Sequence, residues 1–298
     1  MNKRCHEPSQ YGLIFSALAL LSSPSFAGPP FLTDDPAPVD YKHSEFYTSS
    51  TYDKASDEKN IAVPAFEYNY GVLPDTQLHI MLPFLRNAPN DGPSEYGPGD
   101  VEVGVKYRFV QETDTTPQIG IFPMAELNTG DSDKGLGNGK TWWKLPVWIQ
   151  KSWGEWTTYG GAGYAINHAD GMKSYPFGGW LLQKDLGEKW TLGGEVFSQG
   201  KTTDAGQATT FLNVGGYYKF TPDFNLLFSA GHNVSGEHHT VAYLGLWWTW
   251  GGDEKAEQKS SMAPMNSQWS LSDDTITSLE STSSRFSTDL RTPPKQNH

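Results

Sequence analysis

The clearest pattern in this chain is a strict alternation of apolar and polar positions over residues 101–109. The odd positions are valine, tyrosine or phenylalanine, and three even positions are charged, namely Glu102, Lys106 and Arg108. Because successive side chains of a strand point to opposite sides, this segment predicts a strand with one apolar and one charged face. In a soluble sandwich the apolar face would pack on protein, whereas in a membrane barrel it would meet lipid and the charges would line a lumen.

Similar alternation, bounded by turn residues, predicts twelve strands along the chain. They are residues 44–53, 60–72, 75–86, 99–111, 116–128, 140–152, 155–167, 175–184, 189–199, 208–220, 223–232 and 239–250. The segments 44–53 and 175–184 carry the weakest pattern, and the second of them has no clear phase.

The connections between these segments alternate in length. Those after odd-numbered strands are mostly long and polar, such as 87–98 and 129–139, whereas those after even-numbered strands are short, such as 153–154 and 221–222. Outer-membrane barrels have an even number of strands, long external loops and short periplasmic turns. The predicted fold class is therefore all-β: an antiparallel transmembrane β-barrel of about 12 strands. It would occupy residues 44–250 and lie in the outer membrane of a Gram-negative bacterium.

Three further segments flank the predicted barrel. Residues 1–27 have a basic start, an apolar core and a small-x-small ending at Ala27, which is typical of a signal peptide. Residues 28–43 are rich in proline and acidic side chains and are expected to form an N-terminal periplasmic arm. Residues 251–298 are polar and without periodicity, which predicts a disordered C-terminal tail. The single cysteine, Cys5, falls in the signal peptide, so the mature chain would contain none.

Charge narrows the possible functions and also marks candidate site residues. The net charge of −12 argues against nucleic acid as a partner, because binding it needs a basic surface. The strand phases instead turn charged side chains into the lumen, where they must pair or contact water, since isolated charges are costly inside a protein. Such a set could hold a closed lumen together, or it could line a path for a solute. The lumen-lining candidates are Glu67, His79, Glu102, Lys106, Arg108, Glu126, Lys144 and Glu195.

Three other motifs have some features of functional sites. Residues 131–135 have the Asp-x-Asp-x-Gly spacing of a calcium loop, but Trp142 occupies the twelfth position, where an EF-hand has glutamate. Residues 231–239 gather three histidines, a serine and a glutamate, which suggests a metal site or a lipase; however, Ser235 lies in a predicted loop and the spacing differs from that of outer-membrane phospholipase. No helix follows the glycines of 135–139, so they do not indicate a nucleotide site. The sequence therefore predicts no catalytic residue, no metal and no cofactor.

Several stretches follow the order found in a known family. They are Gly28–Pro36, Glu67–Gly71, Gln77–His79, Gly99–Phe109 and Gln150–Gly154. From about residue 28 to residue 250, the chain resembles the outer-membrane family named for the MetA pathway of phenol degradation. The resemblance implies a barrel with a role in moving aromatic or other hydrophobic compounds, and it supplies no agreed site residues. Many such barrels end on an aromatic residue, whereas here a long tail follows Trp250.

Together these observations predict a channel or transporter that lets small hydrophobic or aromatic molecules cross the outer membrane by passive diffusion. The expected partners are outer-membrane lipid, those solutes and the barrel assembly machinery. A structural or adhesive envelope barrel with a closed lumen is the alternative, and an outer-membrane enzyme is a third hypothesis. Twelve strands give a barrel of intermediate width, between eight-stranded barrels that side chains fill and larger porins that hold an aqueous channel.

Overall fold

The computed structural model describes residues 29–56, 58–236 and 238–252. The predicted signal peptide and nearly all of the predicted tail lie outside the described residues. Within the described residues, no helix is long and apolar enough to cross a membrane.

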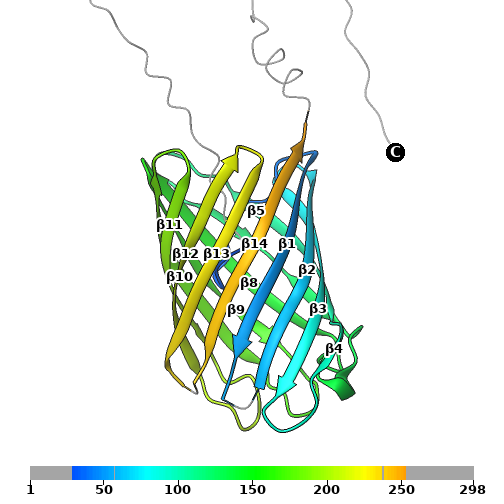
Figure 1. The fold of residues 1–298 in the computed structure, drawn as a ribbon. Helices are drawn as coiled ribbons and strands as arrows, with labels where there is room; N and C mark the ends of the chain where they lie inside the picture. Colours follow the sequence, from blue (N-terminus) through cyan, green and yellow to red (C-terminus); the bar gives the residue numbers. More distant parts are fainter. Residues whose placement is uncertain (1–28, 57, 237, 253–298) are drawn as a thin grey trace, which may run out of the picture. The chain divides into compact units, whose positions relative to one another are not determined.

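The described chain consists almost entirely of strands, joined by turns and loops (Figure 1). One short 3-10 helix, η1, spans Ser132–Lys134. The strands are β1 (His43–Lys54), β2 (Glu58–Leu73), β3 (Thr76–Pro89), β4 (Glu95–Pro98), β5 (Val101–Val110), β6 (Gln118–Ile121), β7 (Met124–Leu127), β8 (Trp142–Trp153), β9 (Trp156–Ile166), β10 (Tyr175–Leu186), β11 (Trp190–Gln199), β12 (Thr209–Thr221), β13 (Phe224–Ser235) and β14 (Thr240–Gly251).

The strands close into an antiparallel barrel, because β14 pairs with β1 along the full length of both strands, from His43 opposite Gly251 to Lys54 opposite Thr240. Two positions in the wall are shared by two short strands each. β4 and β5 both pair with β3, and β6 and β7 both lie between β5 and β8. The fourteen strands therefore fill twelve positions, which confirms the predicted barrel. The break between β6 and β7 falls at Pro123, which has no N–H to donate to a neighbouring strand.

The distribution of apolar and polar side chains in the wall is the reverse of that in a soluble protein. On β5, Val105 is 40% exposed, whereas Glu102 and Lys106 are 5% and 3% exposed. The same inversion recurs around the barrel, where leucines are exposed on the outer face and polar side chains such as Gln77, Gln150, Thr191 and Asn213 are buried. Exposed leucines of this kind are Leu78, Leu145, Leu192, Leu212 and Leu244. A continuous apolar outer face and a polar interior define a barrel embedded in lipid.

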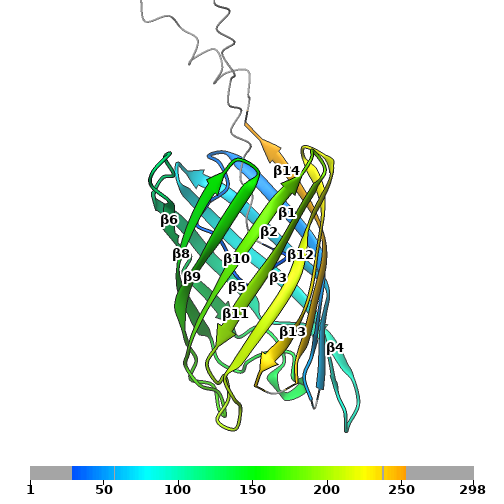
Figure 2. The same ribbon diagram turned by 90° about the vertical axis from the view of Figure 1, so that its left-hand side faces the viewer.

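The two ends of the barrel differ as the sequence predicted. Short turns join β2 to β3, β8 to β9, β10 to β11 and β12 to β13 at one end. The longer connections, including residues 128–141 and 200–208, lie at the opposite end together with β4 (Figures 1 and 2). The first strand begins and the last strand ends at the end with the short turns. This arrangement assigns the short-turn end to the periplasm and the long loops to the cell exterior.

Residues 29–42, which precede β1, lie inside the barrel (Figure 1, dark blue). We call this segment the strap. It leaves the lumen at the periplasmic end, where Tyr41 forms a bridge with Gly71 of β2 and the amide of Lys42 donates to the carbonyl of Gly71. Thr33 and Asp35 in its middle are completely shielded from solvent. The segment that the sequence assigned to a periplasmic arm therefore enters the lumen from the periplasmic side.

Candidate functional site

The lumen contains a chain of polar contacts across β2, β3, β5, β7 and β8, which we call the charge ladder (Glu67, His79, Glu102, Lys144 and Glu126). His79 stands at its centre, with Nε2 3.1 Å from Oε1 of Glu102 and Nδ1 3.5 Å from Oε1 of Glu67. Lys144 Nζ continues the chain, 2.7 Å from Glu102 and 2.9 Å from Glu126. The ladder places five of the eight sequence candidates in one connected network.

The ladder depends on strand register. His79 of β3 lies opposite Gly104 of β5, and the lack of a side chain at Gly104 leaves room for the ring of Phe122. The His79 ring meets the Phe122 ring edge-on, with 5.3 Å between centroids. Asn69 completes the histidine's environment, since its Oδ1 lies 2.8 Å from His79 Nδ1 and its amide donates to Glu67 at 2.8 Å. A buried network with its polar atoms paired is rigid, and it fixes where each charge stands in the lumen.

Lys106 belongs to a different cluster, because it binds the strap. Its Nζ lies 3.0 Å from Oδ1 of Asp34 and 3.6 Å from Oδ2 of Asp35. The ammonium also stands over the Phe122 ring, 4.9 Å from its centroid. Further along the strap, the amide of Val39 donates to the side-chain oxygen of Gln77 at 2.9 Å. These contacts hold one end of the strap against β3 and β5.

Glu195 holds the other end of the strap from β11, a strand far around the barrel wall from β3 and β5. Its carboxylate on β11 accepts from the backbone N–H of Leu32, at 3.2 Å, and from that of Thr33. The amide of Asn213 on β12 donates to the same carboxylate, and the hydroxyl of Ser229 on β13 donates to the carbonyl of Pro30. The strap therefore spans the lumen from Lys106 on β5 to Glu195 on β11.

Arg108 lies apart from both clusters. Its guanidinium donates to Asp75 in the turn between β2 and β3, with the shorter contact at 2.6 Å, and to Gln118 at 3.1 Å. Its side chain is about a quarter exposed, at the periplasmic rim. Glu102, Lys106 and Arg108 therefore stand in three separate surroundings, because their neighbours on adjacent strands differ at each level of the barrel.

An inner chamber lies beside the charge ladder and a row of aromatic rings. Its volume is about 370 Å³. Its lining includes Glu67, His79, Glu102 and Lys144 of the charge ladder, together with rings on β8, β10, β11 and β12. Those rings form what we call the aromatic row, which consists of Trp148, Phe177, Phe197 and Phe211. Neighbouring rings lie in contact, with 6.3 Å between the centroids of Trp148 and Phe177 and again between Phe177 and Phe197.

A second, outer chamber of about 510 Å³ lies toward the external loops. Its lining is rich in amide and carboxylate side chains, including Glu58, Asn60, Asn87 and Glu126, and it shares Trp142 and Tyr175 with the inner chamber. The loop 128–141 forms part of its wall through residues 135–138.

Asp100 holds this external loop in place. Oδ1 of Asp100 accepts from the backbone N–H groups of Thr129 and Gly130 at 3.1 and 2.9 Å, and Oδ2 accepts from that of Asn138 at 2.7 Å. Asp100 itself lies in the break between β4 and β5, so the interruption of the strand creates the residue that anchors the loop. The sequence motif considered as a calcium loop is thus a loop organised by Asp100 and by the small helix η1.

The periplasmic half of the lumen is partly filled by apolar side chains that the sequence pattern did not indicate. Tyr47, Tyr217, Leu227 and Trp247 form a buried apolar cluster, in which the rings of Tyr47 and Trp247 stack with 5.8 Å between centroids. We expected the inward face to be polar, so inward aromatic residues on β1, β12 and β14 carried no signal. Together with the strap, this cluster narrows the periplasmic half of the barrel.

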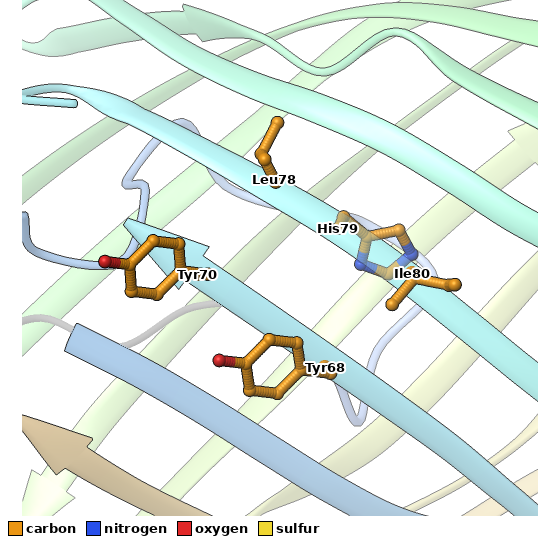
Figure 3. A pocket seen from close by; sticks show the side chains of 5 residues that line it. All are labelled: Tyr68, Tyr70, Leu78, His79 and Ile80. Atoms are coloured by element: carbon orange, nitrogen blue, oxygen red, sulfur yellow. The ribbon is translucent and has the colours of Figure 1, made fainter. Parts of the chain in front are cut away.

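A separate groove of about 330 Å³ lies on the outer face, along β2 and β3 (Figure 3). It is lined by Tyr68, Tyr70, Leu78, His79 and Ile80. Tyr68 and Leu78 belong to the exposed apolar set, whereas the His79 side chain is buried in the charge ladder. The groove is therefore part of the lipid-facing surface and not of the lumen.

The histidine-rich segment 231–239 lies at the external end of β13 and β14. His232 and His238 meet edge to face with 4.8 Å between ring centroids, and His239 Nε2 contacts Asp53 of β1 at 2.5 Å. In the part of the chain that the structure describes, no group of three or more His, Cys, Asp or Glu side chains is arranged to hold a metal ion.

The closed wall, the apolar outer face and the polar lumen define an outer-membrane β-barrel. Residues 47–250 match the family described as the MetA pathway of phenol degradation. The chain belongs to this family, as the motifs in the sequence indicated.

Comparison with a solved outer membrane channel shows the same fold. The COG4313 outer membrane channel from Pseudomonas putida F1 aligns with a TM-score of 0.61 at 14% identity, over 72% of this chain and 98% of that one. The KdgM porin aligns with a TM-score of 0.46 at 9% identity, over 68% of this chain and 99% of that one. The CymD monoaromatic hydrocarbon channel aligns with a TM-score of 0.36 at 9% identity, over 72% and 89%. No curated protein matches the chain.

Proposed function

We propose that this protein is an outer-membrane channel through which small hydrophobic or aromatic molecules pass by diffusion. The observation that carries the proposal is the inner chamber of about 370 Å³, whose lining combines the aromatic row with Glu67, His79, Glu102 and Lys144. That volume falls within the range of small-molecule sites, which are concave, mostly apolar and oriented by a few polar groups. The Pseudomonas putida protein with the same fold is an outer membrane channel, which agrees with this proposal.

The lining residues would divide the work of binding a solute. Rings of the aromatic row offer offset or edge-on contacts to an aromatic solute, each contributing about 0.5–1.5 kcal/mol beyond burial of its area. Glu67, His79, Glu102 and Lys144 offer fixed polar groups. All eight sequence candidates are proposed to act on the passage, the ladder by lining it, Lys106 and Glu195 by holding the strap, and Arg108 by fixing the rim. Outer-membrane lipid and the barrel assembly machinery are the partners that such a barrel would need.

The proposal is tested by uptake of aromatic solutes into proteoliposomes that contain the mature chain. Phe177→Ala removes one ring from the chamber. It should raise the concentration of an aromatic solute at which uptake is half-saturated by about two- to tenfold. Phe220→Ala is the matched control, because Phe220 is exposed on the outer face near the periplasmic end. Equal uptake by protein-containing and empty liposomes would refute a channel function.

A structural barrel with a closed lumen is the second candidate, and one observation favours it. The strap and the cluster around Tyr47 and Trp247 occupy the periplasmic half of the lumen, and Thr33, Asp35 and Pro36 of the strap are fully buried. If the strap is a permanent plug, planar bilayers containing the protein should stay non-conducting even when Lys106 is replaced by methionine. A channel should conduct, and it should conduct more when that contact is lost.

A further inference from the structure

The two chambers carry more carboxylates than cations. The inner chamber is lined by Asp34, Asp53, Glu67 and Glu102, and the outer one by Glu58, Asp100 and Glu126. The positive groups that face these seven carboxylates are Lys144, His79 and His239 in the lining, and Lys106, which contacts Asp34. Even with both histidines protonated, seven negative charges stand against four positive ones.

Two carboxylates in this set are held by amides, which leave their charge uncancelled. Both oxygens of Glu58 accept from side-chain amides, those of Asn60 and Asn87, at 2.9 and 3.0 Å. Glu67 accepts from the amide of Asn69 at 2.8 Å, and its nearest cationic group is His79 at 3.5 Å. Lys144 is shared by Glu102 and Glu126, so that trio also keeps one negative charge.

The surroundings of these charges strengthen their effect on a passing solute. A cleft lined by one sign of charge between low-dielectric walls concentrates ions of the opposite sign and repels ions of the same sign. The aromatic row acts in the same direction, because the face of an aromatic ring carries partial negative charge and attracts ammonium groups. Both features lie in the same chamber, and both oppose the entry of an anion.

We infer that this lumen selects solutes by charge, so that aromatic amines and quaternary ammonium ions pass in preference to aromatic carboxylates. The inference rests on the proposed channel function and deepens it, because it names the class of solute. Glu67 and Glu58 are the specificity-determining residues, one in each chamber.

The experiment compares three solutes of similar size in proteoliposomes that contain the mature chain: phenyltrimethylammonium, benzyl alcohol and benzoate. Reversal potentials in a KCl gradient across a planar bilayer give the ion selectivity of the same preparation. We expect a cation-selective potential and uptake in the order phenyltrimethylammonium, benzyl alcohol, benzoate.

Substitutions assign the selectivity to residues. Glu67→Gln keeps the acceptor for Asn69 and removes one charge, and Glu58→Gln does the same in the outer chamber. One unit charge about 7 Å away in water changes the local concentration of each monovalent ion by about threefold, so each variant should lower the cation-to-anion permeability ratio by about sevenfold. Glu188→Gln is the matched control, because it removes the same charge from an exposed turn. Heat-modifiable migration on gels verifies that each variant has folded, and Glu58→Gln carries the test if Glu67→Gln fails to fold.

The outcomes separate the inference from the proposed function. Benzoate uptake equal to or faster than that of phenyltrimethylammonium would overturn the charge selection while leaving a channel in place. Cation selectivity that persists unchanged in both glutamine variants would overturn the assignment to Glu67 and Glu58. Failure of every solute and of every ion to cross would refute the channel itself.

Discussion

The contact between Lys106 and the strap offers the sharpest test of how this barrel is closed. Lys106 is 3% exposed, and its ammonium is the cationic partner of Asp34 and of the fully buried Asp35. Lys106→Met keeps most of the side-chain volume and removes the charge. Breaking a buried ion pair by removing one partner costs about 3–5 kcal/mol, because the remaining charge stays desolvated. Since every 1.4 kcal/mol is a factor of ten, the ratio of docked to undocked strap should fall by about two to three and a half orders of magnitude.

Two measurements report on the docked strap. Single-channel recording should show that Lys106→Met raises the occupancy of a larger conductance state. Hydrogen exchange should become faster at residues 29–42 and remain slow in the strands. Lys151→Met is the matched control, because Lys151 pairs with Glu112 at 3.2 Å but both side chains are about a quarter exposed. An exposed pair of this kind contributes about 0–1 kcal/mol, so the control should leave both signals nearly unchanged.

A double-mutant cycle decides whether loss of the ion pair between Lys106 and the strap causes the changes in conductance and hydrogen exchange. Asp35→Asn removes the buried charge that Lys106→Met leaves behind, so the double variant should lose less than the sum of the single losses. Contacting residues typically show coupling of about 0.5–3 kcal/mol. Additive effects, or unchanged conductance and exchange in Lys106→Met, would refute the role given to this contact.

Three further predictions concern the wall, the external loop and export. Val105→Arg places a charge on the lipid face near the middle of β5 and should cost about 2–4 kcal/mol in urea titrations of the barrel in lipid, whereas Val234→Arg, at the external end of β13, should cost about 0–1 kcal/mol; equal losses would contradict the lipid assignment. Asp100→Ala leaves the backbone N–H groups of Gly130 and Asn138 without their acceptor, at about 1–3 kcal/mol each, and removes one of the two acceptors of the Thr129 N–H. Limited proteolysis should therefore cut the loop 128–141 while the barrel keeps its heat-modifiable migration, and an uncut loop would show that Asp100 does not hold it. Mass spectrometry of the exported protein should find Gly28 as its first residue, and an N-terminus that retains Cys5 would contradict the signal peptide.

The strands were predictable because the two faces of a barrel wall contact different surroundings. Where one face meets lipid and the other a polar lumen, alternate positions differ in polarity, as they do on β5. The pattern fails on β10, predicted as 175–184 without a clear phase. There the inward Phe177 and Leu181 are as apolar as the outward Trp180 and Leu182, because this part of the lumen is lined by rings. Loss of alternation inside a series of alternating strands is therefore itself a sign of an apolar lumen wall.

The site was only partly predictable. Inward direction follows from the phase of each strand, and the phase predicts Glu67, His79, Glu102, Lys144 and Glu126 on the same side of the wall. Their pairing depends on the stagger between strands, which a single sequence does not contain, so the contacts of Arg108 with Asp75 and Gln118 could not be predicted. The strap is held inside the lumen by an ion pair between its Asp34 and the buried Lys106, and by its backbone N–H groups, which donate to Gln77 and Glu195. Those partners are far from the strap in sequence. The sequence hint at a strap in the lumen was that Lys106 and Glu195 are charged residues at inward positions and would need partners there.

The closing pair of strands has a consequence for the order in which the molecule forms. Every pairing between wall positions except one joins neighbours in the chain, so most of the sheet can grow as successive hairpins between strands that are close in sequence. Only β1 and β14 must meet across almost the whole barrel sequence, and the entropy of closing that long loop is concentrated in this single late step. Because the strap precedes β1 directly, the same step that seals the cylinder also encloses the segment that fills it. Folding of the wall and filling of its interior thus become one event at one edge of the sheet.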